Sequence, residues 1–366
     1  MRLKKGPPDF VLFITTLTLL GIGLVMVFSS SAVTANVNYG DAYYFFKKQL
    51  VWAVISVVAM VVVMKLNFLR LKDLAIPLVV FSIICLILVV TPLGMDVKGS
   101  SRWFNFGFFR FSPSELAKIA IVMFFARALE IKLDKISSLT KGVLPFLAML
   151  TVVCGLIMLQ PDLGTAFTIA GTLFFMLMIA GAQWIHLGLI TLSGVVAVAA
   201  AIIFEPYRME RVTAFLNPWK YASDEGFQTI QSLYALGSGG LFGMGLGRSR
   251  QKFFYLPEQH TDFIFAILGE ELGFIGASLV VALFLLFAWR GFKIAINAPD
   301  NFSRLLAAGI TVLITFQAAI NIGVVSGALP VTGITLPFIS YGGTSLLFTM
   351  IGVGLLLNIS RYSSQN

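Results

Sequence analysis

The amino-acid sequence has few charged residues and only two cysteines. Of its 366 residues 12% are charged and 58% are hydrophobic, against about 25% and about 45–50% in ordinary soluble domains. So few polar residues cannot cover that much apolar surface in water, which excludes a soluble globule. Cys85 and Cys154 each lie inside an apolar run, which excludes a disulfide framework and a thiolate metal site. We expect both to be small core residues.

The motifs of several common enzyme classes are also missing. There is no GxxxxGK[ST] loop, no HExxH helix and no GxSxG turn, which argues against nucleotide hydrolysis, zinc proteolysis and serine esterase chemistry. The net charge of +9 comes from Lys and Arg residues that are scattered between hydrophobic segments. This distribution argues against nucleic acid as a partner and favours membrane lipid or phosphate.

What the sequence does contain is long apolar segments. A span needs about 20 mostly apolar residues to cross a hydrocarbon layer of about 30 Å. We identify ten such segments, at about 10–29, 50–64, 74–91, 114–128, 143–159, 164–182, 185–204, 263–289, 305–325 and 341–359. The sequence therefore predicts an all-α polytopic membrane protein, with residues 1–366 forming a single integral membrane domain of about ten transmembrane helices.

An even number of spans places both termini on one side of the membrane. Short loops on that side hold 14 Lys and Arg residues, and short loops on the other side hold five. Positive charge in short loops marks the cytoplasmic side. We therefore expect both termini to be cytoplasmic.

The longest stretch between spans, residues 205–262, is then a large extracellular loop. Loops of this length are usually functional. Its middle, from Gly226 to Gly247, is apolar and has six glycines from Gly237 onward, which favours a re-entrant or interfacial helix followed by a flexible turn. The loop 92–113, with Trp103 and several Phe, is expected to lie in the membrane interface.

Ionisable residues at or inside spans are costly and indicate functional sites by default. Glu115 and Lys118 are three residues apart on one helix face, where they can form an ion pair. Asp162, in the turn Gln-Pro-Asp-Leu-Gly, can cap a helix or take part in chemistry. Glu270 and Glu271 lie about two turns inside a span. They predict either a buried pair with a partner such as Lys118 or a proton-coupled pathway.

Asp262 closes the long extracellular loop, just before an apolar run enters the bilayer. It can act in chemistry or cap the helix, with Thr261 as the competing cap. Ten to fourteen residues earlier lie Arg248, Arg250 and Lys252. Arginine forks bind phosphate oxygens bidentately, so this group predicts either a pyrophosphate clamp or a solvated basic loop.

Four motifs resemble those of the SEDS proteins, the FtsW/RodA/SpoVE family. They are RQKFFYLPEQHTDFIFAILGEELG at 250–273, SPSELAK at 112–118, QPDLGT at 160–165 and PVTGITLPFISYGG at 330–343. Together with the ten spans, the resemblance covers essentially the whole chain. The sequence MVFSSS at 26–31 is more similar to the FtsW and SpoVE branch than to RodA, and the short tail after the last span resembles SpoVE.

The resemblance implies a peptidoglycan glycosyltransferase of the bacterial cytoplasmic membrane. Such an enzyme polymerises lipid II at the outer face, for the septal or the spore-cortex wall, together with a class B penicillin-binding protein. The resemblance places the essential aspartate at Asp262 and the family's ion pair at Glu115 and Lys118. Asp262 would then accept the proton of an acceptor sugar hydroxyl. The side chains expected to bind the substrate and its leaving pyrophosphate are Arg208, Arg211, Arg248, Arg250, Lys252 and His260.

Two alternatives differ in class from the transferase. A lipid II flippase would use the buried charges at Glu115, Lys118, Glu270 and Glu271 as a pathway. A non-enzymatic scaffold would recruit the penicillin-binding protein through lipid-facing helices. The sequence names no metal ligands, and the only cofactor considered is a divalent cation, Mg or Mn, with unknown ligands.

Overall fold

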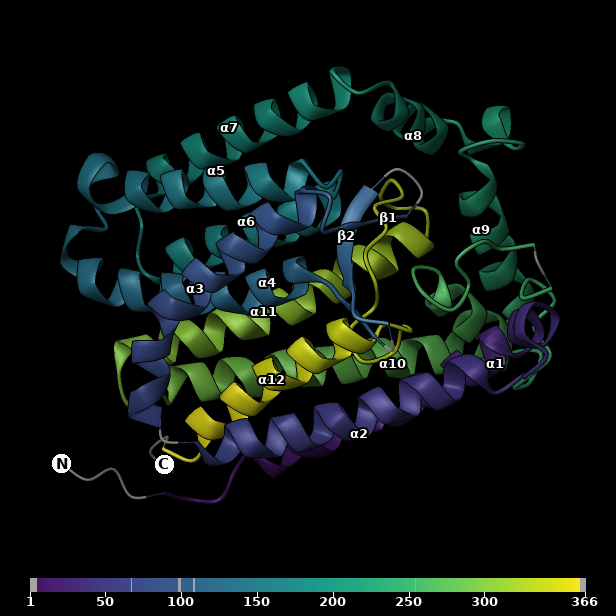
Figure 1. The fold of residues 1–366 in the computed structure, drawn as a ribbon, viewed down its shortest axis with the longest axis horizontal. Coiled ribbons are helices and arrows are strands. Elements are labelled where there is room, and N and C mark those ends of the chain that lie inside the picture. Colours follow the sequence, from purple (N-terminus) through teal and green to yellow (C-terminus); the bar gives the residue numbers. More distant parts are fainter. Residues whose placement is uncertain (1–4, 67, 98–99, 108, 254, 363–366) are drawn as a thin grey trace.

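A bundle of long helices makes up most of the molecule (Figure 1). The structure is a computed structural model that describes residues 5–66, 68–97, 100–107, 109–253 and 255–362. Within these ranges, ten helices have 15 or more residues. They are α1 (Phe10–Tyr39), α2 (Tyr44–Lys65), α3 (Phe68–Val90), α4 (Pro113–Lys132), α5 (Leu144–Met158), α6 (Leu163–Ile179), α7 (Trp184–Ile203), α10 (Ile264–Ile296), α11 (Asn301–Val325) and α12 (Gly343–Ser360).

Each of the ten predicted spans falls on one of these helices, and the polytopic fold is confirmed. Among the described residues, eight helices are long and apolar enough to cross a membrane. The other two are α6, which has only 17 residues, and α4, which carries Glu115 and Lys118 near its start. Helix α1 runs ten residues beyond its predicted end, because the first residue able to stop it is Gly40, a C-cap with φ of 69°.

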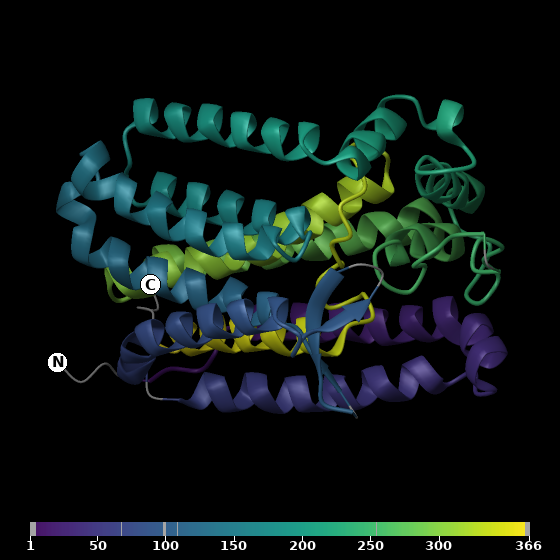
Figure 2. The same cartoon turned by 45° about the horizontal axis from the view of Figure 1, so that its top comes forward.

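A small antiparallel sheet interrupts the helical pattern. Its strands β1 (Met95–Val97), β2 (Ser100–Asn105) and β3 (Arg110–Phe111) pair in that order. Strands β2 and β3 contact α3, α4 and α12, and Figure 2 shows the sheet beside the bundle. An all-α prediction misses these strands, which are too short for an alternating pattern to distinguish them from an interfacial segment.

The long segment 205–262 folds onto the bundle. It contains α8 (Pro206–Leu216), the 3₁₀-helix η3 (Pro218–Tyr221) and α9 (Phe227–Gly239), followed by turns up to α10. The predicted helix in its middle is confirmed as α9. Ser232 on α9 donates a hydrogen bond of 2.6 Å to the carbonyl of Val325 at the end of α11. Gly239 packs so closely on α10 that a Cβ there would lie 2.1 Å from the Gly269 carbonyl oxygen.

The two ends of the bundle carry different parts of the chain. At the terminal end, defined by residues 5–9 and 360–362, Arg290 pairs with Asp9 and the Asp9 amide donates to the Ser360 hydroxyl at 3.0 Å. The first and the last described residues thus lie at the same end, as an even number of spans requires (Figure 1). The opposite end, which we call the loop end, carries the sheet, the turn 160–162, the segment 205–262 and the loop 330–342. Helices α11 and α12 are the most buried spans and α7 is the least.

Candidate active site at the loop end of the bundle

Asp262 lies two residues before α10. Its backbone carbonyl takes part in hydrogen bonds with neighbouring residues of the described chain, and its side chain does not. Its carbonyl accepts a hydrogen bond of 2.7 Å from Asn321, which also donates to the Ile334 carbonyl at 2.7 Å. The start of α10 has no side-chain cap, and Thr261 instead donates to Glu258. The helix-cap alternative for Asp262 and Thr261 is therefore wrong. Within the described part of the chain, the Asp262 carboxylate oxygens form no hydrogen bond or ion pair.

A short loop, residues 331–334, lies against this carboxylate. Gly333 in that loop is exposed, and a Cβ built on it would lie 3.7 Å from Oδ2 of Asp262. The φ of Gly333 is 74°, a left-handed conformation that favours glycine. The start of α6 packs on the same loop, because a Cβ on Gly164 would lie 2.9 Å from the Thr332 carbonyl. Because residue 333 is a glycine, no side chain at that position covers the carboxylate.

The electrostatic surroundings of Asp262 suit a base. Burial, with the negative charge of Glu258 next in weight, raises the pKa of Asp262 to about 7, and the positive charges of Arg211 and Arg102 oppose this rise. A general base works best when its pKa is near the working pH. Burial also lowers the pKa of His260, against the opposing charge of Glu258. His260 packs on the rings of Phe45 and Tyr341, with centroids 4.6 and 5.6 Å away.

Only one of the two predicted arginines on α8 reaches this loop. Arg211 donates through Nη1 to the Val331 carbonyl at 3.1 Å, and its Nε lies 3.7 Å from a carboxylate oxygen of Glu225. Arg208 donates to the Ala201 carbonyl at 2.9 Å, so it ties α8 back to α7. Arg211 is therefore the α8 residue best placed to meet a substrate at Asp262.

The structure brings in an arginine that the sequence did not single out. Arg102 on β2 donates from Nε to the Gln160 carbonyl at 2.9 Å and from Nη2 to the Pro161 carbonyl at 2.6 Å. Its Nη1 lies 3.9 Å from Oδ2 of Asp162. Asp162 itself caps α6 by accepting from the amide and hydroxyl of Thr165, as predicted. The contacts of Arg102 are made 58 residues away in sequence, so no local pattern reveals them.

Three predicted residues form a buried network between α10 and the turn 245–252. Lys252 lies 3.1 Å from Oε1 of Glu271 and both side chains are buried. Ser29 also donates to Glu271, and Glu270 accepts from the Ser249 hydroxyl and from the amide of residue 250. The partner of Glu271 is therefore Lys252, not Lys118, and Lys252 does not belong to an open phosphate clamp. The side chains of Arg248 and Arg250, on the same turn, are exposed.

The predicted ion pair on α4 is present and is connected to the loop end. Lys118 lies 2.9 Å from a carboxylate oxygen of Glu115 and donates to Gln317 at 2.7 Å. Gln317 in turn donates to the Thr335 carbonyl at 3.0 Å. The pair thus links α4 and α11 to the loop that follows residue 334.

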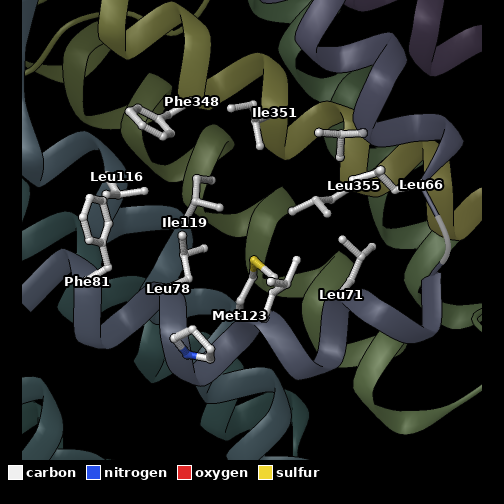
Figure 3. A pocket seen from close by; sticks show the side chains of 13 residues that line it. Leu66, Leu71, Leu78, Phe81, Leu116, Ile119, Met123, Phe348, Ile351 and Leu355 are labelled. Atoms are coloured by element: carbon white, nitrogen blue, oxygen red, sulfur yellow. The ribbon is translucent and has the colours of Figure 1, made fainter.

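An apolar cavity of about 350 Å³ lies beside this pair. Figure 3 shows its lining, which comes from α2, α3, α4 and α12. Ile119 and Phe348 line both this cavity and the small one at Glu115 and Lys118. The remaining side chains of the larger cavity are those of Val63, Leu66, Leu71, Leu74, Pro77, Leu78, Phe81, Leu116, Met123, Ile351 and Leu355. A hydrocarbon chain fits such a lining, and a polar ligand does not.

A divalent cation finds no ready set of side-chain ligands at the loop end. Among the residues that the structure describes, no group of three or more His, Cys, Asp or Glu could hold a metal ion. The carboxylate of Asp162 is already occupied by its helix cap.

Comparison with known proteins agrees with the resemblance found in the sequence. A family model for FtsW, RodA and SpoVE, described as "Cell cycle protein", matches residues 10–365. The chain is 50% identical to stage V sporulation protein E of Bacillus subtilis, over 99% of this chain and 100% of that one. It is 44% identical to the probable peptidoglycan glycosyltransferase FtsW of Trichlorobacter lovleyi, over 96% of this chain and 93% of that one.

The fold is shared as well. One similar structure is a chain from a peptidoglycan synthase complex, solved in work on the structural coordination of polymerization and crosslinking. This chain and that one superpose with a TM-score of 0.81 and are 33% identical in sequence. The match covers 98% of this chain and 99% of that one. Sequence and structure therefore establish that this chain belongs to the FtsW/RodA/SpoVE family.

Proposed function

We propose that this chain is a peptidoglycan glycosyltransferase that polymerises lipid II, with Asp262 as its general base. The observation that carries the proposal is a carboxylate with a pKa of about 7, free of hydrogen bonds within the described chain and open toward an exposed glycine. An acceptor sugar hydroxyl would attack the anomeric carbon while its proton passes to Asp262. Proton transfer of this kind contributes about 10²–10⁴-fold to the rate.

The leaving group sets the second requirement of the reaction. As the bond from the anomeric carbon to the pyrophosphate oxygen breaks, its electron pair stays on the pyrophosphate and negative charge grows there. Fixed positive charge stabilises this change. Arg211 supplies such charge next to the loop 331–334, and the exposed Arg248 and Arg250 remain further candidates on the neighbouring turn.

The cavity supports a lipid-linked substrate. Its lining is apolar throughout, and three of the helices that line it, α2, α3 and α12, are long and apolar enough to cross a membrane. The hydrocarbon chain of lipid II would lie there, while its pyrophosphate and sugars stay at the loop end. We place the loop end outside the cell and the termini in the cytoplasm, in line with the excess of Lys and Arg in the short loops at the terminal end.

A crosslinking partner follows from the same proposal. The related synthase complex couples polymerization to crosslinking, and a class B penicillin-binding protein would supply the second activity to this chain. One relative is named as a sporulation protein and another as FtsW, so both the spore cortex and the septum are settings for the activity. The flippase alternative loses support, because three of the four charges it needs lie in ion pairs: Glu115 with Lys118, and Glu271 with Lys252.

The test compares the native chain with the Asp262→Asn variant. Each is purified with its penicillin-binding partner and given labelled lipid II, and glycan polymer is measured on gels. We expect at least about 10²-fold less polymer from Asp262→Asn, with unchanged melting temperature and partner binding. Asp224→Asn serves as the control, because Asp224 is an exposed acid of the same segment.

Three outcomes would contradict the proposal. Polymer formation by Asp262→Asn at the native rate would remove Asp262 as the base. Transfer of labelled lipid II across vesicle membranes by the native protein, with no polymer, would favour the flippase, and neither activity would favour the scaffold.

A further inference from the structure

Arg102 is anchored along one edge of its guanidinium group. The two donors on that edge, Nε and Nη2, bind the carbonyls of Gln160 and Pro161. A guanidinium has five N–H donors in a fixed planar fork, so three remain, and two of them lie on the edge formed by the two terminal nitrogens. The Arg102 side chain is 24% exposed. One edge is thus fixed to the backbone while the other is free to meet a ligand.

The charge of Arg102 is only partly neutralised. Its nearest carboxylate, that of Asp162, lies 3.9 Å from Nη1, which is too far for a hydrogen bond. Both oxygens of Asp162 accept instead from Thr165 at the start of α6. Arg102 therefore keeps positive charge at a partly buried position, where an anion is the natural ligand.

The guanidinium group of Arg211, on α8, is also fixed by its neighbours. Its Nη1 donates to the Val331 carbonyl at 3.1 Å and its guanidinium stacks on the ring of Tyr207, 4.4 Å from the centroid. The carboxylate of Glu225 is 3.7 Å from Nε, and the Arg211 side chain is 26% exposed. This arginine too is fixed by backbone and ring, with donors left over.

Both arginines are attached to the same small region. Arg211 binds Val331, and Gly333, two residues on, lies against the Asp262 carboxylate. Arg102 holds the turn 160–161, and Gly164, just after that turn, packs on Thr332. The loop 331–334 is therefore contacted by the arginine of α8, by the turn that Arg102 holds and by the base. Arg102 and Arg211 are also the two cations whose charge lowers the pKa of Asp262.

We propose that Arg102 and Arg211 form a pyrophosphate-binding pair beside Asp262, and that Arg102 is a substrate-binding residue as well as a support for the turn 160–162. This inference rests on the proposed function, because it takes the ligand to be the pyrophosphate of a lipid-linked sugar. The free edge of Arg102 would bind phosphate oxygens bidentately, and the terminal N–H groups that Arg211 has left would add further hydrogen bonds to them. When the bond to the anomeric carbon breaks, the electron pair moves to a pyrophosphate oxygen that these N–H groups already contact, so no proton is needed there.

The test measures binding separately from turnover. The full-length chain with its partner is titrated with inorganic pyrophosphate, and two quantities are recorded: the rise in melting temperature on binding and the inhibition of lipid II polymerisation. A ligand that binds only the folded state raises its stability in proportion to the logarithm of concentration over Kd. The variants are Arg102→Gln, Arg102→Lys and Arg211→Gln. Lys47→Gln is the matched control, because Lys47 is 67% exposed.

We expect Arg102→Gln and Arg211→Gln each to weaken pyrophosphate binding by about 10- to 100-fold, the effect of losing charge-assisted hydrogen bonds to an anion. Arg102→Lys should bind pyrophosphate more tightly than Arg102→Gln, because lysine keeps the positive charge. It should bind less tightly than the native chain, because lysine lacks the planar guanidinium group. Removing either positive charge should also shift the acid limb of the pH–rate profile to higher pH. Lys47→Gln should change none of these quantities.

The results that refute the arginine pair differ from the result that refutes the proposed function. If Arg102→Gln and Arg102→Lys fold with native melting temperatures and bind pyrophosphate as tightly as the native chain, Arg102 is only a support for the turn and the pair is refuted. If Arg102→Gln does not fold, the Arg102→Lys and Arg211→Gln data decide in the same way. A native polymer yield from Asp262→Asn would refute the proposed function. If Asp262→Asn loses activity but the arginine variants bind pyrophosphate as tightly as the native chain, only the arginine pair is refuted.

Discussion

Single residues at the loop end owe their properties to neighbours that are distant in the sequence. The Asp262 carbonyl is held by Asn321 and its carboxylate faces Gly333. Besides the nearby Glu258, its pKa responds to charges that are distant in the sequence: Arg211 on α8, Asp162 before α6 and Arg102 on β2. The sequence could place Asp262 at the start of a span and among basic residues. It could not supply the burial that raises the pKa, because burial depends on the packing of loops that are far apart in the chain.

The raised pKa leads to a prediction for pH dependence. A general base must be ionised, and a pKa of about 7 means that the ionised fraction of Asp262 falls as the pH decreases through 7. We therefore expect kcat/KM for lipid II polymerisation to drop about tenfold for each pH unit below about 6 and to level off above about pH 8. The measurement is the initial rate between about pH 5.5 and 8.5 at subsaturating lipid II. A flat profile over this range would indicate a carboxylate near its ordinary pKa of 3.8.

At the scale of elements, a buried ion pair attaches the turn 245–252 to α10. Lys252 is the only described cation within salt-bridge distance of Glu271. Removing one partner of a buried pair leaves an uncompensated charge and typically costs about 3–5 kcal/mol. We expect Lys252→Met to lower the free energy of unfolding by about that amount, and the double variant Lys252→Met, Glu271→Gln to regain part of it.

Thermal unfolding of the purified protein measures this effect, with Lys47→Met as the control because Lys47 is 67% exposed. A native melting temperature for Lys252→Met would show that the pair does not hold the turn. The same variant tests the sequence interpretation, in which Lys252 contacts substrate. In that case pyrophosphate inhibition would weaken while stability stayed native.

The elements themselves were predictable to different degrees. The spans followed from continuous apolar runs, since a helix in lipid satisfies its own backbone groups. The strand Ser100–Asn105 could not be predicted in this way, because it is short and its role depends on the contacts of Arg102 with the carbonyls of the turn 160–161. The N-cap by Asp162 was predictable because a cap contacts the residue three positions on, here Thr165.

For the whole molecule, the ion pair between Asp9 and Arg290 joins the start of α1 to the far end of α10. Both side chains are mostly buried, at 8% and 18% exposure, and Asp9 also caps α1 through the amide of Leu12. We expect Arg290→Gln to lower the free energy of unfolding by about 1.5–3 kcal/mol, the range for a hydrogen bond to a charged group. Thermal unfolding gives the value, and Lys293→Gln on the same helix end is the control.

A melting temperature for Arg290→Gln equal to that of the control would mean that this ion pair does not stabilise the bundle. No sequence pattern pairs these two residues, which are 281 positions apart. Charge counts could assign both to the same side of the membrane, and only the helix lengths and their packing bring them into contact.

The Gly6 amide donates to the Arg361 carbonyl at 2.7 Å, so the first and last helices close into a ring of contacts. Residues 6 and 361 are therefore neighbours in space. A circularly permuted chain that joins them and opens in an exposed turn such as 222–224 should keep Asp262 beside the two arginines.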